Sequence, residues 1–316
     1  MRLLLTLILV VSAFFGAYWV VVAQMIPRYG ADALAGTLQM QASPGRVSGF
    51  PLAFRTELAD PAWRDAQGSV LWRTPRLDIQ TPSYQPHRVQ LDFPVPQFLE
   101  LPGLSLQIDP EIQIITAVLQ PDLTVREAQI EIETLQITPP VQIAGLHMLQ
   151  GSLVQEEAGL YAATLAISDL RLSDDLRQKI APSETLPALI DSITLDASLT
   201  FTAPFSLRDA TPDLIAIEVT RLRLDWGDLA LTLSGAVERS DSGLFDGQLT
   251  LHSNTWQGLH QLLGSSGLLA RDAVMLAGMF LAAQADPGTG EITLPLSVTQ
   301  SAIALGPFVL GYLPGR

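Results

Sequence analysis

Cysteine is absent from the 316-residue sequence, and lysine occurs once, at Lys179. Without cysteine the chain can form neither disulfides nor thiolate metal sites, and it has no cysteine nucleophile. Charged residues make up only 16% of the chain, and the 32 acidic residues outnumber the 18 basic ones, which gives a formal net charge of −14. Because nucleic-acid binding depends on lysine and arginine neutralising phosphates, this balance argues against nucleic acid as a partner.

Motifs that carry chemistry are also missing. No HxH, HExxH, GxSxG, GxGxxG or P-loop pattern occurs, and the histidines have no metal-ligand spacing. The four histidines are His87, His147, His252 and His260. Acidic pairs at residues 156–157 and 174–175 fall in a predicted turn and at a predicted helix start, where carboxylates serve solvation and the helix dipole. The sequence therefore nominates no catalytic residue, no metal ligand and no cofactor, and we expect a protein that is not an enzyme.

The N-terminus carries a long uncharged run. Residues 3–23 contain no charged side chain, and these 21 residues match the roughly 20 that a helix needs to cross a bilayer. Arg2 precedes the run, so the positive-inside rule keeps the N-terminus in the cytoplasm. We expect residues 1–27 to form a single-pass anchor in the inner membrane, with the main domain in the periplasm. The alternative is a cleaved signal peptide ending near Ala23, which also places residues from about 28 onward outside the cytoplasm.

After Pro27 the sequence consists of short alternating runs separated by proline and glycine. In residues 193–201, apolar side chains occupy every odd position and Thr, Asp or Ser every even position. Such alternation is typical of strands with one face on a core, so we expect residues 28–316 to be mainly β, with a curved antiparallel sheet and few helices. An open groove and a half-barrel both fit this pattern, as do two β-halves meeting near residues 173–192. A phase slip between Ile132 and Leu135 predicts a bulge, and the tripeptide Arg-Leu-Asp occurs at both 76–78 and 223–225.

A few segments have helical character. Residues 173–179 begin with a capping serine and two acids and end in basic residues, and residues 183–190 are predicted as a second short helix. Residues 255–263 and 268–284 form a predicted helical pair. Within it, every residue of AVMLAGMFLAA at 273–283 is apolar or glycine. This segment is too short to span a membrane, so we expect it either in the core against the sheet or in the lining of a hydrophobic cavity.

A hairpin is predicted at residues 231–253, with polar residues on one face and leucines on the other. If the sheet has a function, we expect it on the leucine side and in the segment that covers that side. Methionine packs adaptably around irregular apolar surfaces, which suits a ligand cavity. The candidate ligand-lining residues are Leu231, Leu233, Leu249, Leu251, Trp256, Met275, Met279 and Phe280. The alternative for the helical members of this set is a core helix that covers the sheet.

Four stretches resemble a known bacterial family. They are SGFPLAF at 48–54, LWRTPRLDIQTPSYQPHRVQLDFP at 71–94, GLFDGQLTL at 243–251 and LGPFVLGYLP at 305–314. They resemble the envelope family called domain of unknown function 2125, for which no catalytic residues are assigned. In architecture, an N-terminal anchor followed by amphipathic strands is also similar to the AsmA-like envelope proteins, whose curved β-grooves carry lipids between membranes. This looser similarity implies a sheet that shelters acyl chains on an apolar concave face.

These patterns together predict a membrane-anchored, non-enzymatic envelope protein whose amphipathic sheet binds a lipid-like ligand or supports lipid handling. Its expected partners are the membrane, through residues 3–23, and lipid or other envelope proteins. The alternative is an envelope scaffold with a closed core and no ligand, whose partners bind the sheet edges or loops.

Overall fold

The computed structural model describes residues 40–64, 70–94, 96–141, 143–180, 186–206, 212–240, 242–265 and 271–313. Strands dominate these residues and pair in antiparallel fashion, which confirms the mainly β, antiparallel prediction. In this part of the chain no helix is both long and apolar enough to cross a membrane. The predicted anchor at residues 3–23 lies outside the described residues.

Contacts separate the chain into two compact units. Unit 1 comprises the described residues of Met1–Ile132 and Ser206–Ala210, and unit 2 those of Glu133–Phe205 and Thr211–Arg316. Strand β8 (Val125–Thr138) contains the boundary between them. Thr134 in β8 has a φ of 48°, so a backbone irregularity lies at the phase slip predicted between Ile132 and Leu135.

Unit 1 is a meander in which two strands are interrupted. Its strands before β8 are β1 (Met40–Ser48), β2 (Ala53–Arg64), β3 (Leu71–Arg73), β4 (Arg76–Pro82), β5 (Arg88–Asp92), β6 (Gln97–Leu101) and β7 (Leu104–Leu119). β2 pairs with β1 along one edge and with β4 and β3 in succession along the other. β4 pairs with β5 and β3 with β6, while β7 pairs with both β5 and β6. β3 and β4 are therefore two halves of one long strand, and β5 and β6 are two halves of the next.

Prolines lie where the pairing of these strands is interrupted. They are Pro61, Pro75, Pro96 and Pro110. Because proline has no backbone N–H, it cannot complete a ladder, and side-chain hydrogen bonds add to the backbone bonds that join the strands near these points. Trp72 Nε1 donates to Gln97 Oε1 at 2.9 Å, and Gln97 Nε2 donates to Gln113 Oε1 at 2.5 Å. Gln97 and Gln113 are buried, so this chain of side-chain hydrogen bonds satisfies polar groups inside unit 1.

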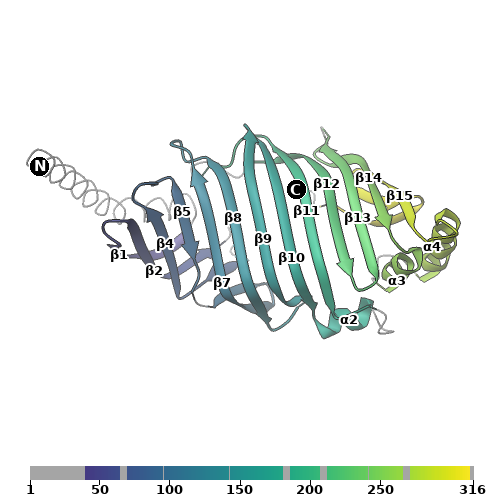
Figure 1. Cartoon of the computed structure of the whole chain (residues 1–316), viewed down its shortest axis with the longest axis horizontal. Helices are drawn as coiled ribbons and strands as arrows, with labels where there is room; N and C mark the ends of the chain where they lie inside the picture. The colour runs from purple at the N-terminus through teal and green to yellow at the C-terminus, as the bar shows by residue number, and fades with distance from the viewer. Residues whose placement is uncertain are drawn as a thin grey trace, which may run out of the picture. The chain divides into compact units, whose positions relative to one another are not determined.

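Unit 2 is a longer meander in which each strand from β9 to β17 pairs with the next one along the chain. These strands are β9 (Ile143–Glu157), β10 (Leu160–Leu172), β11 (Leu189–Phe201), β12 (Leu214–Trp226), β13 (Leu229–Arg239), β14 (Phe245–Ser253), β15 (Ile292–Thr299), β16 (Ala302–Leu305) and β17 (Phe308–Tyr312). Helix α2 (Asp174–Ile180) follows β10, and helices α3 (Trp256–Ser265) and α4 (Arg271–Gln284) lie between β14 and β15 in the sequence (Figure 1).

The helices α2, α3 and α4 confirm three of the four predicted helical segments. The helix predicted over residues 183–190 is wrong for its described part, because residues 186–188 are not helical and Leu189 begins β11. The backbone there bonds to the sheet instead. Trp226 Nε1 donates to the carbonyl of Pro187 at 2.8 Å, and Leu172 N donates to that of Ala188 at 3.1 Å.

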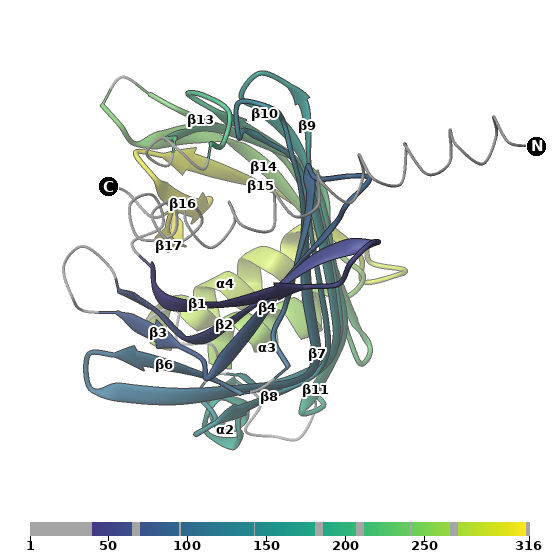
Figure 2. The same ribbon diagram turned by 90° about the vertical axis from the view of Figure 1, so that its left-hand side faces the viewer.

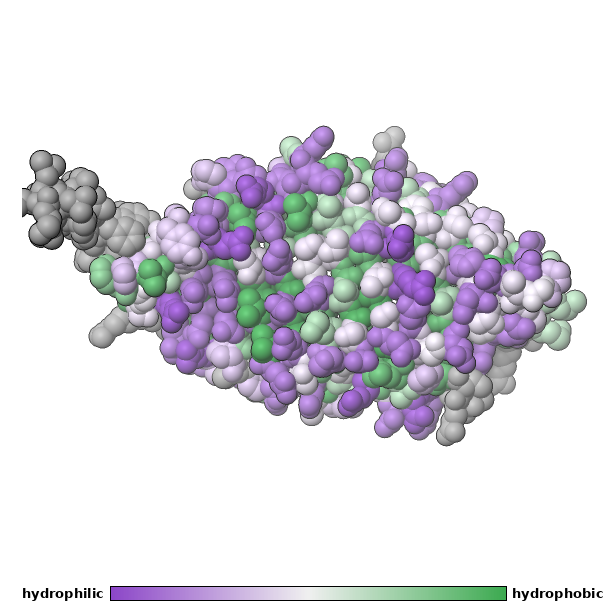
Figure 3. Space-filling model, viewed as in Figure 1, coloured by the Kyte–Doolittle hydropathy of each residue, from purple (hydrophilic) through white to green (hydrophobic). Residues whose placement is uncertain are grey.

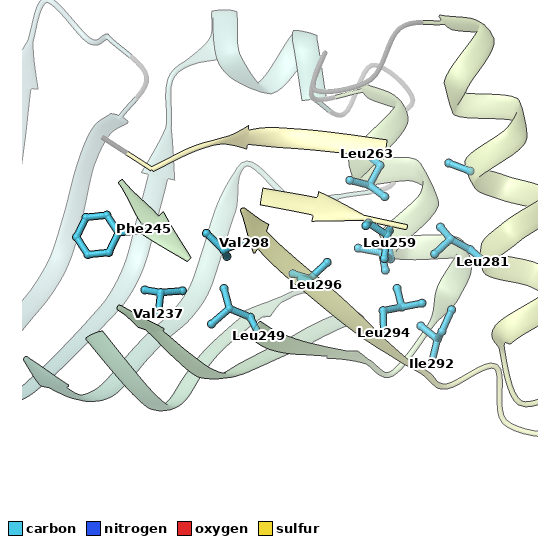
Figure 4. Close-up of a cluster of buried hydrophobic side chains, with 12 residues drawn as sticks. Val237, Phe245, Leu249, Leu259, Leu263, Leu281, Ile292, Leu294, Leu296 and Val298 are labelled. Carbon is cyan, nitrogen blue, oxygen red and sulfur yellow. The ribbon is translucent and has the colours of Figure 1, made fainter. Parts of the chain in front are cut away.

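A core of unit 2 lies between α3, α4 and the strands from β13 to β16. Leu259 and Leu263 of α3, Leu281 of α4, and Leu294 and Leu296 of β15 are all buried in it (Figure 4). Figure 2 shows these strands bending around the two helices. Within unit 2, one end of the sheet is therefore closed by a helical layer.

Candidate ligand-binding face

The register of unit 2 aligns apolar side chains in rows that cross successive strands. Leu165 of β10 lies opposite Leu195 of β11, which in turn lies opposite Leu222 of β12. Residues directly opposite one another on paired strands point to the same face. The row continues through Leu233, Leu251 and Leu294 of β13, β14 and β15.

Three further rows run beside this one on the same face. They are Leu149–Ile167–Ile193–Leu224–Leu231, Leu153–Ala163–Ala197–Val219–Gly235–Leu249–Leu296 and Tyr161–Leu199–Ile217–Val237–Gly247–Val298. A register shift in β12 between Val219 and Leu222 keeps these two side chains on one face although they are three positions apart. We call the four rows together the apolar face.

Burial changes along the apolar face. At its β15 end, Leu294, Leu296 and Val298 are at most 5% exposed, because they lie in the core with α3 and α4. At its other end, Leu165, Leu195 and their neighbours are mostly only partly buried. Among the described residues, none from β9, β10 or β11 belongs to that core, and the helices contact mainly one another and β15. The apolar face thus runs from a closed core to a stretch over β9, β10, β11 and the Leu222–Leu224 part of β12 whose described residues do not belong to that core, and we call this the open stretch.

Aromatic side chains close one margin of the open stretch. Tyr161 is fully buried, and its ring packs edge-on against Phe201 and Phe205, with centroids 5.9 and 5.4 Å away. Its hydroxyl accepts a hydrogen bond from Phe205 N at 2.9 Å. The phenol is therefore fixed in place, and the rings give this margin a rigid apolar wall.

The opposite face of the sheet is polar. The hydroxyls of Ser152 in β9 and Thr164 in β10 lie 2.7 Å apart, and Ser192 in β11 donates to Asp225 in β12 at 3.1 Å. Over β9 to β15, Figure 3 shows hydrophilic and pale residues interspersed with hydrophobic ones, not a continuous hydrophobic surface. The sheet of unit 2 therefore has one apolar face and one solvated face.

The repeated Arg-Leu-Asp tripeptide has the same geometry in both units. Arg76 donates to Asp78 from Nε and Nη2 at 2.8 and 2.7 Å, and Arg223 donates to Asp225 at the same two distances. The hydrogen bonds from Arg223 are the main cause that lowers the pKa of Asp225. Leu77, between the first pair, is buried on the other side of its strand. In each unit the tripeptide thus places an ion pair on one side of its strand and a leucine on the other.

The structure divides the sequence-predicted ligand-lining residues into two groups. Leu231, Leu233, Leu249 and Leu251 lie on the apolar face, and Trp256 and Phe280 pack against the same core from the helices. Met275 and Met279 instead lie on the outer side of α4, each 68% exposed. The six apolar-face and core residues line the closed end, so the prediction that they contact a ligand stays a prediction.

Sequence reasoning missed the open stretch as a candidate site. The alternation in residues 193–201 was visible, but it does not say which strands neighbour β11 or whether a second layer covers them. Strand pairing identifies the neighbours of β11, and the core around α3 and α4 shows where a second layer lies in unit 2. The described parts of the rows through Ile193 and Leu195 in β10 to β12 lie outside this core, on the same face as the leucines of the predicted hairpin.

The described titratable residues form no metal centre. No group of three or more His, Asp or Glu side chains suited to a metal ion occurs among them. His252 Nδ1 lies 3.1 Å from Thr293 Oγ1, and His260 Nε2 lies 3.0 Å from the Val274 carbonyl oxygen. Each imidazole therefore has a separate structural partner.

Comparison with known proteins gives one match. A family model described as "Uncharacterized protein conserved in bacteria (DUF2125)" matches residues 22–314. No curated protein and no solved structure matches the chain. The resemblance to this family is confirmed over nearly the whole chain, while the looser similarity to the AsmA-like proteins is not confirmed.

Proposed function

The chain belongs to the bacterial family DUF2125, and we propose that it is a membrane-anchored, non-enzymatic protein of the cell envelope whose apolar face binds a lipid-like ligand. The observation that supports this proposal is the open stretch of the apolar face. Two rows of Leu and Ile side chains cross β10, β11 and β12 there, and none of them belongs to the core that the described helices α3 and α4 form with the sheet. Antiparallel sheets ordinarily pack such a face against a core.

An acyl chain has the size and chemistry to cover the open stretch. Burying one methylene contributes about 0.8 kcal/mol, so a chain with roughly ten buried methylenes would gain about 8 kcal/mol before the cost of ordering it. The polar opposite face stays in water, which lets the sheet remain folded while one side holds a hydrocarbon. No catalytic group is required by such a role.

The location is part of the same proposal. The uncharged run at residues 3–23, preceded by Arg2, supports a single-pass anchor in the inner membrane with both units in the periplasm. A ligand-binding face tethered in this way stays close to a source of lipid. The membrane and its lipids are then the principal partners.

A pair of adjacent positions gives a sharp test. A photo-crosslinking phenylalanine analogue would replace Leu195, on the apolar face, or Thr194, its neighbour on the polar face, in the full chain expressed in bacteria. After irradiation, mass spectrometry of the purified protein should find a lipid adduct at position 195 and none at 194. Equal adducts at both positions, or none at 195, would refute the lipid-binding proposal.

The alternative function is an envelope scaffold, and the closed core under α3 and α4 favours it. If a protein covers the open stretch, the photoreactive group at position 195 should give an adduct of protein mass in place of lipid mass. The same experiment therefore separates the two functions.

A further inference from the structure

Helix α4 has an apolar face on each side. Ala277 and Leu281 are at most 1% exposed and pack in the core. On the other side, Met275, Leu276 and Met279 are 68%, 54% and 68% exposed, and Ala282 and Ala283 are exposed beside them. These five positions follow the spacing of one helix face, and we call them the outer α4 face. A helix that is apolar all round is normally covered on both sides, which leaves the outer α4 face in need of a partner.

Charged residues are few in helices α3 and α4. The chain has 32 acidic and 18 basic residues, yet no Asp, Glu, Lys or Arg occurs at residues 256–264 in α3. None occurs at residues 273–285 either, which cover most of α4 and the residue after it. Acidic residues resume at Asp286, whose carboxylate accepts hydrogen bonds from the backbone of Gly288 and Thr289. Within the two helices, charged residues therefore occur only at Arg271 and Asp272, in the first turn of α4.

The lack of charge favours a hydrocarbon partner over a protein. Protein interfaces are bordered by a polar rim and are depleted in alanine, whereas the outer α4 face includes two alanines and α4 carries charge only in its first turn, at Arg271 and Asp272. Helices that lie in a membrane interface usually have a polar face that stays in water. In α4 the side opposite the outer α4 face packs on the protein core instead. Between its first turn and Gln284, the helix thus presents apolar side chains to a membrane.

We infer that the outer α4 face docks on the surface of a lipid bilayer. The inference rests on the proposed function, since docking would place the apolar face of unit 2 next to the source of its ligand. Because the chain has a net charge of −14 and the one basic residue of α4, Arg271, is followed directly by Asp272, the contact depends on hydrocarbon burial and not on anionic headgroups. We therefore expect docking on zwitterionic lipid and little change with salt.

Single-cysteine labelling can test this contact because the chain has no native cysteine. The full chain, reconstituted in phosphatidylcholine vesicles, would carry an environment-sensitive fluorophore on Met279→Cys, on the outer α4 face. The matched control is Thr250→Cys, at an exposed position on the polar face of β14. Nitroxide groups attached to the lipid chains should quench the label at 279 and spare the label at 250, while iodide in solution should do the reverse.

Every other result at position 279 overturns the inference. Quenching by iodide alone means that the face stays in water, and protection from both quenchers means that protein covers it. A second variant carries the label at Leu276→Cys together with Met279→Glu, which should lose the lipid quenching seen with Leu276→Cys alone.

The two proposals can fail separately. A lipid adduct at position 195 combined with a water-exposed label at 279 leaves lipid binding intact and removes docking. Lipid quenching at 279 without an adduct at 195 leaves docking intact and removes the ligand.

Discussion

The hydroxyl of Tyr161 accepts a hydrogen bond from the backbone N–H of Phe205 at 2.9 Å, so the wall at the margin of the apolar face depends on a phenol and not on ring packing alone. Tyr161→Phe keeps the ring and removes this acceptor from a fully buried site. We expect the free energy of unfolding to fall by about 1–3 kcal/mol, because a buried N–H loses its partner. Urea denaturation followed by circular dichroism measures the loss. Tyr312→Phe, at a tyrosine that is 74% exposed, is the control and should change little.

The side-chain bridge in unit 1 predicts a comparable loss. Gln97→Ala leaves the indole N–H of Trp72 and the amide oxygen of Gln113 without the bonds that Gln97 supplies. Leaving a buried polar group unsatisfied costs about 1–3 kcal/mol, so we expect a loss of about 2 kcal/mol or more in unfolding free energy. Gln90→Ala, in β5, is the control. Equal midpoints for the two variants in urea would show that the bridge contributes nothing.

Asp92 predicts a pH dependence in unit 1. Burial, and then the nearby carboxylate of Asp78, raise the pKa of Asp92 above its ordinary value. The folded state therefore holds this proton more tightly than the unfolded state, so stability falls as pH rises from the ordinary pKa through the raised one. At neutral pH the full loss of stability caused by the shifted pKa of Asp92 is present.

Asp92→Asn should remove that penalty. We expect the variant to be more stable than the natural protein at pH 7 by up to about 1 kcal/mol, since solvent screens a partly exposed group. The advantage should disappear as pH falls below the ordinary pKa of aspartate. Unfolding free energies of both proteins, measured at several pH values, give the difference directly, and a difference that is constant with pH would contradict the assignment.

The alternation of apolar and polar residues along the chain predicted the fold class, because it reflects which face of each strand is buried. The pattern at residues 193–201 matches β11, and the slip between Ile132 and Leu135 matches the positive φ of Thr134. The helix predicted over 183–190 fails for a physical reason that local sequence does not contain. The carbonyls of Pro187 and Ala188 accept hydrogen bonds from Trp226 on β12 and Leu172 on β10, which are not part of the local sequence.

The candidate site was harder to predict than the fold. The sequence grouped the leucines at 231, 233, 249 and 251 on one face, as the register of β13 and β14 has them, because period-two patterning fixes the side of a strand. Whether that face is covered depends on where α3 and α4 pack, and apolar composition alone does not distinguish the buried side of α4 from its exposed side. Leu281 and Met279 are both apolar residues common in helices, yet Leu281 is buried and Met279 is exposed to solvent.

This contrast on α4 gives a fourth prediction. Leu281→Ala leaves a cavity in the core, and we expect the unfolding free energy to fall by about 2–5 kcal/mol. Met279→Ala removes an exposed side chain and should change stability by about 0.5 kcal/mol or less. Thermal and urea unfolding of both variants provide the measurement. Similar losses for the two would mean that the outer α4 face is packed against protein.

The open stretch gives the last prediction, which separates ligand binding from folding. Leu195→Asp puts a carboxylate among Leu165 and Leu222, where an acyl chain would bury it. Because an unpaired charge is costly to bury, we expect lipid adducts formed by a photoreactive group at position 222 to fall about tenfold or more, a factor that requires only about 1.4 kcal/mol. Thr194→Asp, one position earlier and on the polar face, should leave the adducts unchanged. Circular dichroism must show both variants folded, and if they reduce the adducts equally, the lipid does not lie on the apolar face.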